Sequence, residues 1–170
     1  QIPFGGNSFI RKEDMHDYLN DFVTNCLAAI RNRGRQYRVA YSHYWDAGWA
    51  GQKIAEELSV PHVHTPHSLG WWKEHNMGRD MDARQMEKRY RFKERIHKEF
   101  FVYRNCGHII ATTIPQTELL QQQYNVLERH VSVIPPGMDE NRFLPVPPQE
   151  VQNLQKRYKL GAHDVLVVGR

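Results

Sequence analysis

The chain has 170 residues, which is enough for one domain or for one lobe of a larger protein. Its 23 Lys and Arg residues outnumber its 19 Asp and Glu residues, and 40% of its residues are hydrophobic. This composition excludes a disordered chain, a collagen and a mucin-like stalk. No apolar run reaches the roughly 18 residues that cross a bilayer, so we predict a soluble chain without a membrane span.

Two cysteines, Cys26 and Cys106, are too few for a disulfide framework or a four-thiolate zinc site. We therefore expect a cytoplasmic protein. Basic residues alternate with acidic ones instead of forming a block, and a phosphorylated small molecule explains their modest excess as well as a nucleic acid does. The predicted partners are small molecules, without nucleic acid. Because the chain starts at Gln1 and stops after an apolar run, we interpret it as a piece of a longer protein.

The predicted elements begin with a helix over residues 12–32, where apolar residues recur at three-and-four spacing until Gly34. A strand over 38–44 leads through a glycine-containing turn at 45–48 into a helix that carries Trp49, Ile54 and Leu58. A second strand covers 60–65. A loop over 66–78 and a long charged helix over 82–104 follow it.

The second half continues the alternation, with a strand over 107–113, a helix over 115–124 and a strand over 130–134. Strands that alternate with helices predict an α/β fold with a Rossmann-like parallel sheet. A proline-rich connector at 144–148, a helix over 149–159 and a buried-type strand over 164–168 come next. We divide the chain into residues 1–140, 141–148 and 149–170.

Polar residues follow the first predicted strand, where ligands of parallel sheets bind. Tyr44 and Asp46 have side chains that can bond sugar hydroxyls or a phosphate, and the amides of the next helix can hold an anion. The alternative is a capped turn in which Trp45 and Trp49 are packing residues.

Histidines mark the loop after the second strand. His62 and His64 share one face of an extended segment, and with His43 and His67 they form a possible transition-metal site of a hydrolase. The carboxylates that usually complete such sites are absent from this stretch, so we predict no metal. We expect His67 to be a neutral hydrogen-bonding group beside a sugar, with Lys73 as a cation for phosphate. A solvated loop with satisfied histidines is the alternative.

Six basic residues occupy positions 88–98, where Glu94 and Glu99 would partly balance an exposed helix face. Arg95 differs, because it lies beside the apolar stripe, three residues from Phe92 and four from Glu99. From there its guanidinium can reach the crevice and bind phosphate through two parallel hydrogen bonds. Neither a nucleophile elbow nor a phosphate-cradling glycine loop is recognisable in the sequence.

Five motifs occur in one order along essentially the whole chain. They are Ile2-Pro3-Phe4-Gly5-Gly6, His43-Tyr44-Trp45-Asp46-Ala47-Gly48, Thr65-Pro66-His67-Ser68-Leu69-Gly70 with Lys73, Arg95-Ile96 with Glu99, and Ser132-Val133-Ile134-Pro135-Pro136-Gly137-Met138-Asp139 with Phe143. Together they closely resemble the retaining glycosyltransferases of the sucrose-phosphate synthase type, which include the bacterial mannosylfructose-phosphate synthases.

The resemblance implies the GT-B arrangement, in which two Rossmann-like lobes face a cleft. Residues 1–140 would form the later part of the N-terminal acceptor lobe, 141–148 the connector between lobes, and 149–170 the start of the donor-binding lobe. Transfer would proceed with retention and without a protein nucleophile or a required cofactor. The donor would be a nucleotide sugar, UDP-glucose or GDP-mannose, and the acceptor fructose 6-phosphate.

The resemblance also implies roles for single residues. Lys12, Lys73 and Arg95 would hold the acceptor phosphate with Tyr44 nearby, and His67 would be the catalytic residue against the transferred sugar. Asp46 and Ser68 complete the predicted substrate-binding set.

The sequence also departs from the family pattern. The family's N-terminal glycine loop and its donor-lobe basic and acidic residues fall outside these 170 residues, so we expect this piece alone to be inactive. Pro66 stands where many sucrose-phosphate synthases have glycine, and Trp71 and Trp72 stand where they have smaller or polar residues. This aromatic variant leaves the choice of donor sugar, glucose or mannose, open. An inositol phosphate or a growing glycan remains an alternative acceptor.

Overall fold

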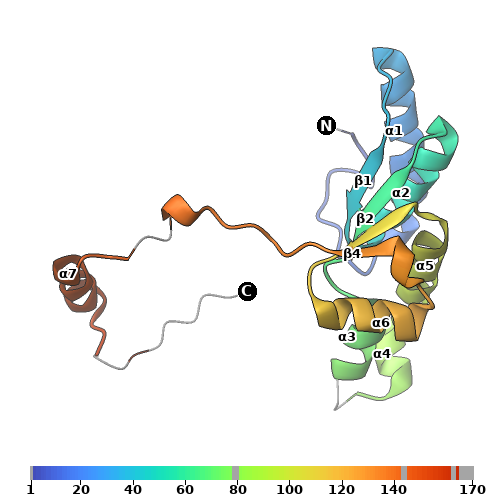
Figure 1. Cartoon of the computed structure of the whole chain (residues 1–170). Helices are drawn as coiled ribbons and strands as arrows, with labels where there is room; N and C mark the ends of the chain where they lie inside the picture. The colour runs from blue at the N-terminus through green and yellow to red at the C-terminus, as the bar shows by residue number, and fades with distance from the viewer. Residues whose placement is uncertain (1, 78–80, 143–144, 162–163, 165–170) are drawn as a thin grey trace. The chain divides into compact units, whose positions relative to one another are not determined.

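The computed structural model describes residues 2–77, 81–142, 145–161 and 164 (Figure 1). The chain divides into two compact units, Gln1–Pro135 and Pro136–Arg170. The first unit contains the sheet and the predicted site, and each unit is described separately.

Strands and helices alternate in the first unit as the sequence predicts. In chain order they are α1 (Leu19–Arg33), β1 (Ala40–His43), α2 (Tyr44–Leu58), β2 (His62–Thr65), α3 (Gly70–Asn76), α4 (Ala83–Tyr90), α5 (Phe92–Asn105), β3 (His108–Ala111), α6 (Ile114–Tyr124) and β4 (Val131–Val133). Single 3-10 turns at Met15–Asp17 and Glu128–His130 precede α1 and β4. In Figure 1, α3, α4 and α6 gather at one end of this unit.

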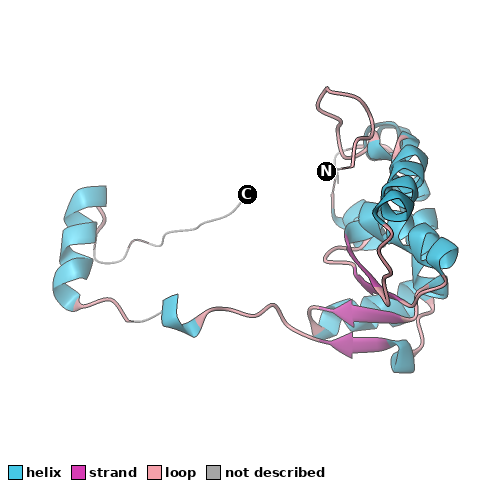
Figure 2. Ribbon diagram, turned by 90° about the horizontal axis from the view of Figure 1, so that it is seen from above, coloured by secondary structure: helices cyan, strands magenta, loops and turns pink. Residues whose placement is uncertain are grey.

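The four strands form one parallel sheet in the order β1-β2-β3-β4, which confirms the predicted α/β fold. Right-handed crossovers between strands in this order place the connecting helices on one face of the sheet. Ser42, His64 and Ile109 lie opposite one another in the register and are buried, whereas Tyr41 on the other face is 53% exposed. Figure 2 shows the strands side by side with helices packed against them.

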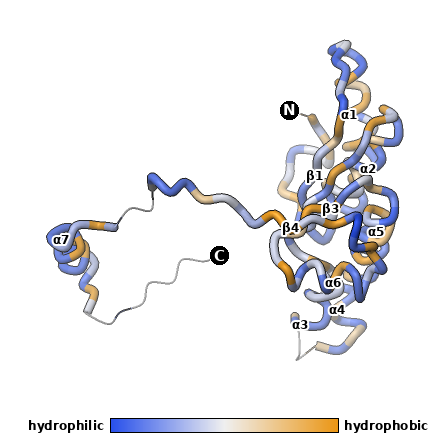
Figure 3. Tube along the Cα trace, in the orientation of Figure 1, coloured by the Kyte–Doolittle hydropathy of each residue, from blue (hydrophilic) through white to orange (hydrophobic). Residues whose placement is uncertain are grey.

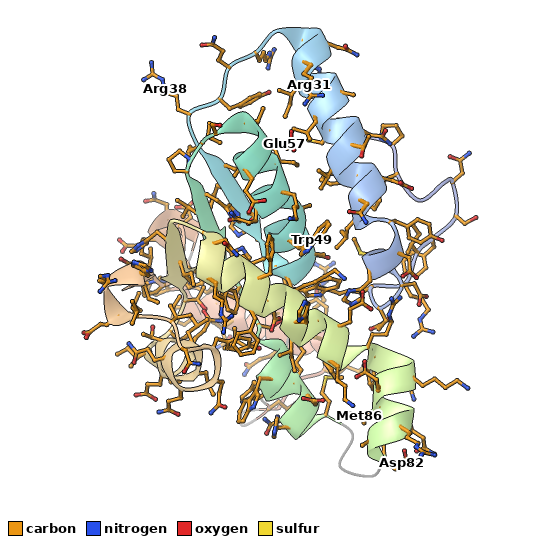
Figure 4. The ribbon with its side chains drawn as sticks, turned by 90° about the vertical axis from the view of Figure 1, so that its right-hand side faces the viewer. Arg31, Arg38, Trp49, Glu57, Asp82 and Met86 are labelled. Carbon is orange, nitrogen blue, oxygen red and sulfur yellow. The ribbon has the colours of Figure 1, made fainter. Side chains whose placement is uncertain are left out.

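Helices α5 and α6 close the core over β3. Val102, Ile109, Leu120 and Tyr124 are almost completely buried in one cluster, and burial of each such side chain contributes about 1.5–3 kcal/mol. Trp49 of α2 lies beside α5 (Figure 4), where the ammonium group of Lys98 is 5.9 Å from the centre of its ring. The helices that carry the predicted site residues are therefore packed against a buried apolar core.

Two predictions near the start of the chain were wrong in detail. The helix predicted over 12–32 begins only at Leu19, because residues 15–17 form a 3-10 turn and Tyr18 lies between the two elements. Gly34 ends α1 in a left-handed conformation, as predicted. The turn predicted at 45–48 lies inside α2, which starts at Tyr44 directly after the strand.

The segment between β2 and β3 also differs from the prediction. The predicted loop over 66–78 contains α3, and the predicted helix over 82–104 is broken at Arg91. Arg91 has a φ of 51°, and its guanidinium bonds the carboxylates of Asp17 and Glu94 at 2.6–2.9 Å. These tertiary contacts stabilise a left-handed residue inside a continuous helical pattern.

The second unit contains a 3-10 turn at Glu140–Arg142 and α7 (Pro148–Tyr158), which confirms the helix predicted at 149–159. Most of α7 has the hydrophilic colour in Figure 3, and none of its side chains is buried. The strand predicted over 164–168 lies outside the described residues after Asp164. Within the described parts of both units, we find no helix with the length and apolarity needed to cross a bilayer.

Candidate active site

A residue with a strained backbone follows each of the strands β1 and β2, within two positions of the strand end. Tyr44 and His67 have φ values of 68° and 58°, a left-handed conformation that costs a non-glycine residue about 1–3 kcal/mol. Such strain persists only where the surrounding structure imposes it. It holds the two side chains at the same edge of the sheet, where their rings are stacked with centroids 5.2 Å apart.

The ring of His67 contacts two neighbours from β1 and α2. It stacks on His43 with centroids 5.0 Å apart, and His43 Nδ1 lies 2.8 Å from His67 Nε2. The ammonium group of Lys12 lies 3.8 Å from the centre of the Tyr44 ring. Burial, and next the charge of His43, lowers the pKa of His67. His67 is therefore neutral at pH 7 and able to donate or accept a hydrogen bond.

Three cations from distant parts of the chain line one cavity of about 70 Å³. Lys12 precedes the first helix, Lys73 lies on α3 and Arg95 on α5, and His16 and Trp45 also contribute to the wall. Sites for whole drug-sized ligands are commonly about 300–1,000 Å³. A cavity of this size therefore suits a single small group, such as a phosphate.

The charges of this cavity are only partly neutralised. Within the described residues, no hydrogen bond or ion pair engages the ammonium groups of Lys12 and Lys73. Burial lowers the pKa of both lysines and the charge of Arg95 lowers it further, while Asp46 opposes the shift at Lys12. A bound dianion relieves this repulsion, because an opposite charge favours the protonated lysines.

Arg95 is 5% exposed and is held at two of its three nitrogens. Its Nε donates to Glu99 Oε1 at 2.8 Å, and its Nη2 donates to the carbonyl and hydroxyl oxygens of Ser68 at 2.9 and 3.2 Å. Nη1 has no hydrogen-bond partner in the described part of the chain. The sequence predicts two parallel hydrogen bonds from Arg95 to a phosphate. In the described part of the chain, Nη1 is the guanidinium nitrogen that remains available to a ligand.

The remaining predicted residues do not line this cavity. Ser68 and His67 line a second cavity of about 220 Å³ together with Trp72 and Gln116. Asp46 lines neither of the two. Its Oδ1 accepts a hydrogen bond from the neighbouring Ala47 amide at 2.8 Å, and its side chain borders a separate apolar hollow. Asp46 thus acts on the site through its charge near Lys12.

The four histidines considered for a metal site fall into two separate pairs. His62 Nε2 and His64 Nδ1 lie 2.7 and 2.8 Å from the buried hydroxyl of Ser42, and Gln52 occupies the other nitrogen of His62. His43 pairs with His67 at the sheet edge. Among the described residues no group of three His, Cys, Asp or Glu side chains converges. This geometry gives no support to the hydrolase alternative.

We expect acidic pH to destabilise the protein through the buried pair. Burial lowers the pKa of His62 to about 4 and that of His64 to about 3, from 6.5. Below pH 6.5 the unfolded chain binds more protons than the folded one, so the free energy of unfolding falls as pH falls towards about 4. Urea unfolding between about pH 7 and pH 5 should show a loss of up to about 1.4 kcal/mol per pH unit for each histidine. A His62→Gln variant should show a shallower dependence, and an equal slope would contradict the assignment.

The model of Glycosyltransferase Family 4 matches residues 8–142, which is most of the chain and includes every predicted site residue. The chain belongs to glycosyltransferase family 4. The family resemblance inferred from the five motifs is thereby confirmed.

This family 4 chain is similar to two enzymes whose names each include a phosphorylated compound. It is 43% identical over 172 aligned positions to mannosylfructose-phosphate synthase of Agrobacterium fabrum, which covers all of this chain and 38% of the relative. It is 33% identical over 143 positions to a D-inositol 3-phosphate glycosyltransferase of Corynebacterium jeikeium, covering 84% of this chain and 32% of the relative. The chain thus spans about a third of the length of these relatives.

A solved structure confirms the fold. The sucrose-phosphate synthase of Thermosynechococcus elongatus superposes with a TM-score of 0.72 at 23% sequence identity, covering 96% of this chain and 37% of that one. The sheet and helices of this family 4 chain therefore have the architecture of a GT-B glycosyltransferase lobe.

The sequence did not predict the buried hydrogen bonds that Glu99 makes next to the cationic cavity. Glu99 was predicted to balance charge on an exposed helix face, but its side chain is 0% exposed and bonds Arg95, Gly70 and Tyr124. A carboxylate four residues after Arg95, beside an apolar stripe, was the available signal. Nothing in the sequence pattern pointed to Tyr124.

Proposed function

We propose that the full-length protein is a retaining glycosyltransferase that transfers a hexosyl group from a nucleotide sugar to fructose 6-phosphate. This chain would supply most of the acceptor-binding lobe. The observation that carries the proposal is the convergence of Lys12, Lys73 and Arg95 on one small cavity.

The phosphate of the acceptor fits this cavity by charge and by size. Each charge-assisted hydrogen bond to a phosphate oxygen contributes about 1.5–3 kcal/mol, and three separate segments each direct one cation to it. When the phosphate of a hexose phosphate is bound in this cavity, the positions that its sugar ring can take are limited. The contact therefore orients the acceptor hydroxyl.

His67 would act on the transferred sugar. In the proposed reaction, the bond between the anomeric carbon and the donor phosphate breaks, and a bond to the acceptor hydroxyl forms on the same face. The acceptor proton passes to the departing phosphate, so no protein nucleophile is needed. The neutral ring of His67 borders the second cavity with Ser68, and from there it would hydrogen-bond the sugar and position it.

The proposal includes two donors and one further acceptor. UDP-glucose and GDP-mannose are the proposed donors, and the match to a D-inositol 3-phosphate glycosyltransferase supports an inositol phosphate as a second candidate acceptor. Both acceptors present a phosphate dianion to the same three cations.

The proposal predicts a strong preference for a phosphorylated acceptor. In the full-length protein, kcat/KM with fructose 6-phosphate should exceed that with free fructose by about a thousandfold, from three contacts of about 1.5 kcal/mol each. Initial rates with each donor and each acceptor give this ratio. Equal rates with fructose and its phosphate would refute the phosphate role, and faster transfer to inositol 3-phosphate would identify the second acceptor as the substrate.

A further inference from the structure

The carboxylate of Glu99 lies fully buried behind the cationic cavity and does not line it. Its two oxygens accept the Gly70 N–H at 3.0 and 2.9 Å, Oε1 also accepts from Arg95 Nε, and Oε2 accepts from the hydroxyl of Tyr124. The Tyr124 oxygen in turn accepts the Trp71 N–H at 3.0 Å. Glu99 and Tyr124 thus satisfy the first two backbone N–H groups of α3, which a helix leaves without partners of its own.

Helix α3 approaches α5 so closely that only glycine fits at its start. A Cβ at Gly70 would lie 2.8 Å from Glu99 Oε2 and 3.2 Å from Arg95 Nε. Lys73 follows Gly70 by three residues, within the first turn of the same short helix. Helix α3 is only seven residues long. The hydrogen bonds that hold its first turn therefore also fix the position of the Lys73 backbone.

We propose that Glu99 and Tyr124 are positioning residues that hold two of the three cations of the cavity in place. Glu99 directs the guanidinium of Arg95, so that Nη1 is the nitrogen left for a ligand. Glu99 and Tyr124 together fix the start of α3 and therefore Lys73. The inference rests on the proposed function, because its consequence is affinity for the acceptor phosphate.

The energetic cost of the arrangement supports a role beyond packing. An ion pair with both partners buried commonly contributes no more stability than well-packed apolar side chains of the same size. Arg95 and Glu99 are 5% and 0% exposed. Buried charge at this place is explained when one partner must present a cation to a ligand.

The test is a Tyr124→Phe variant of the full-length protein, which removes one oxygen atom and keeps the ring in the core. We expect KM for fructose 6-phosphate to rise about tenfold, with kcat and KM for the nucleotide sugar within about twofold of the unchanged protein. The preference for fructose 6-phosphate over fructose should fall by the same factor.

Tyr103→Phe is the matched control. Tyr103 lies on α5 with its ring 4.9 Å from that of Tyr124, and its buried hydroxyl has no hydrogen-bond partner among the described residues. The same substitution in the same cluster therefore removes no hydrogen bond to α3 or Glu99. We expect KM for fructose 6-phosphate to stay unchanged in this variant.

A double variant separates positioning from packing. If Tyr124 acts through Lys73, the tenfold penalty of Tyr124→Phe on KM should largely disappear in a Lys73→Ala background. A lower melting temperature with an unchanged KM, or fully additive penalties, would overturn the positioning role. A KM that Lys73→Ala itself leaves unchanged would instead refute the proposed function, so the two failures are distinguishable.

Discussion

Replacement of Lys73 by alanine should raise KM for fructose 6-phosphate by about 10- to 100-fold in the full-length protein. The ammonium group lines the cationic cavity, and within the described residues it has no hydrogen-bond or ion-pair partner to lose. The variant therefore removes one charge-assisted contact to the phosphate, worth about 1.5–3 kcal/mol, and leaves no protein group unsatisfied. KM for the nucleotide sugar should stay the same.

The control for Lys73→Ala is a lysine of similar exposure away from the cavity. Lys53 on α2 pairs with Glu56 at 3.5 Å, and its ammonium lies over the ring of Phe101. Lys53→Ala should leave both KM values unchanged, since no cation of the cavity is affected. A rise in KM for free fructose equal to that for fructose 6-phosphate would show that Lys73 does not act on the phosphate.

Replacement of Arg95 by alanine should lower the free energy of unfolding by about 3–5 kcal/mol, the range for breaking a buried ion pair. The loss is large because Glu99 would remain buried without its cation, and the carbonyl and hydroxyl oxygens of Ser68 would both lose the hydrogen bond from Arg95 Nη2. In folded protein, KM for fructose 6-phosphate should also rise steeply. Urea unfolding measures the first effect and initial rates the second.

Two further variants serve as comparisons for Arg95→Ala. Arg31 on α1 and Glu57 on α2 form an exposed ion pair with an N–O distance of 3.7 Å (Figure 4). Arg31→Ala breaks this pair and should lower the free energy of unfolding by no more than about 1 kcal/mol. Arg95→Lys keeps the charge without the planar fork, so it should recover part of the stability and less of the affinity. A loss of stability with no change in KM would leave Arg95 a structural residue only.

Much of the fold of the first unit could be predicted from local sequence patterns. The alternation of strands and helices follows from apolar spacing, which depends on neighbouring residues alone, and Gly34 ends α1 where the sequence indicated. The five motifs likewise located His67, Lys73 and Arg95, because chemistry-bearing residues cluster in the segments that follow parallel strands.

Local patterns and motifs were thus enough to predict the fold class, the family and the three cations of the cavity. How those residues are held depends on contacts between distant segments. Arg91 breaks a continuous helical pattern because it bonds Asp17, 74 positions earlier, and Asp46 borders a different hollow from Lys12. Glu99 is buried because Gly70 and Tyr124 surround it. Each of these outcomes depends on a partner from a distant segment, and local periodicity contains no information about such partners.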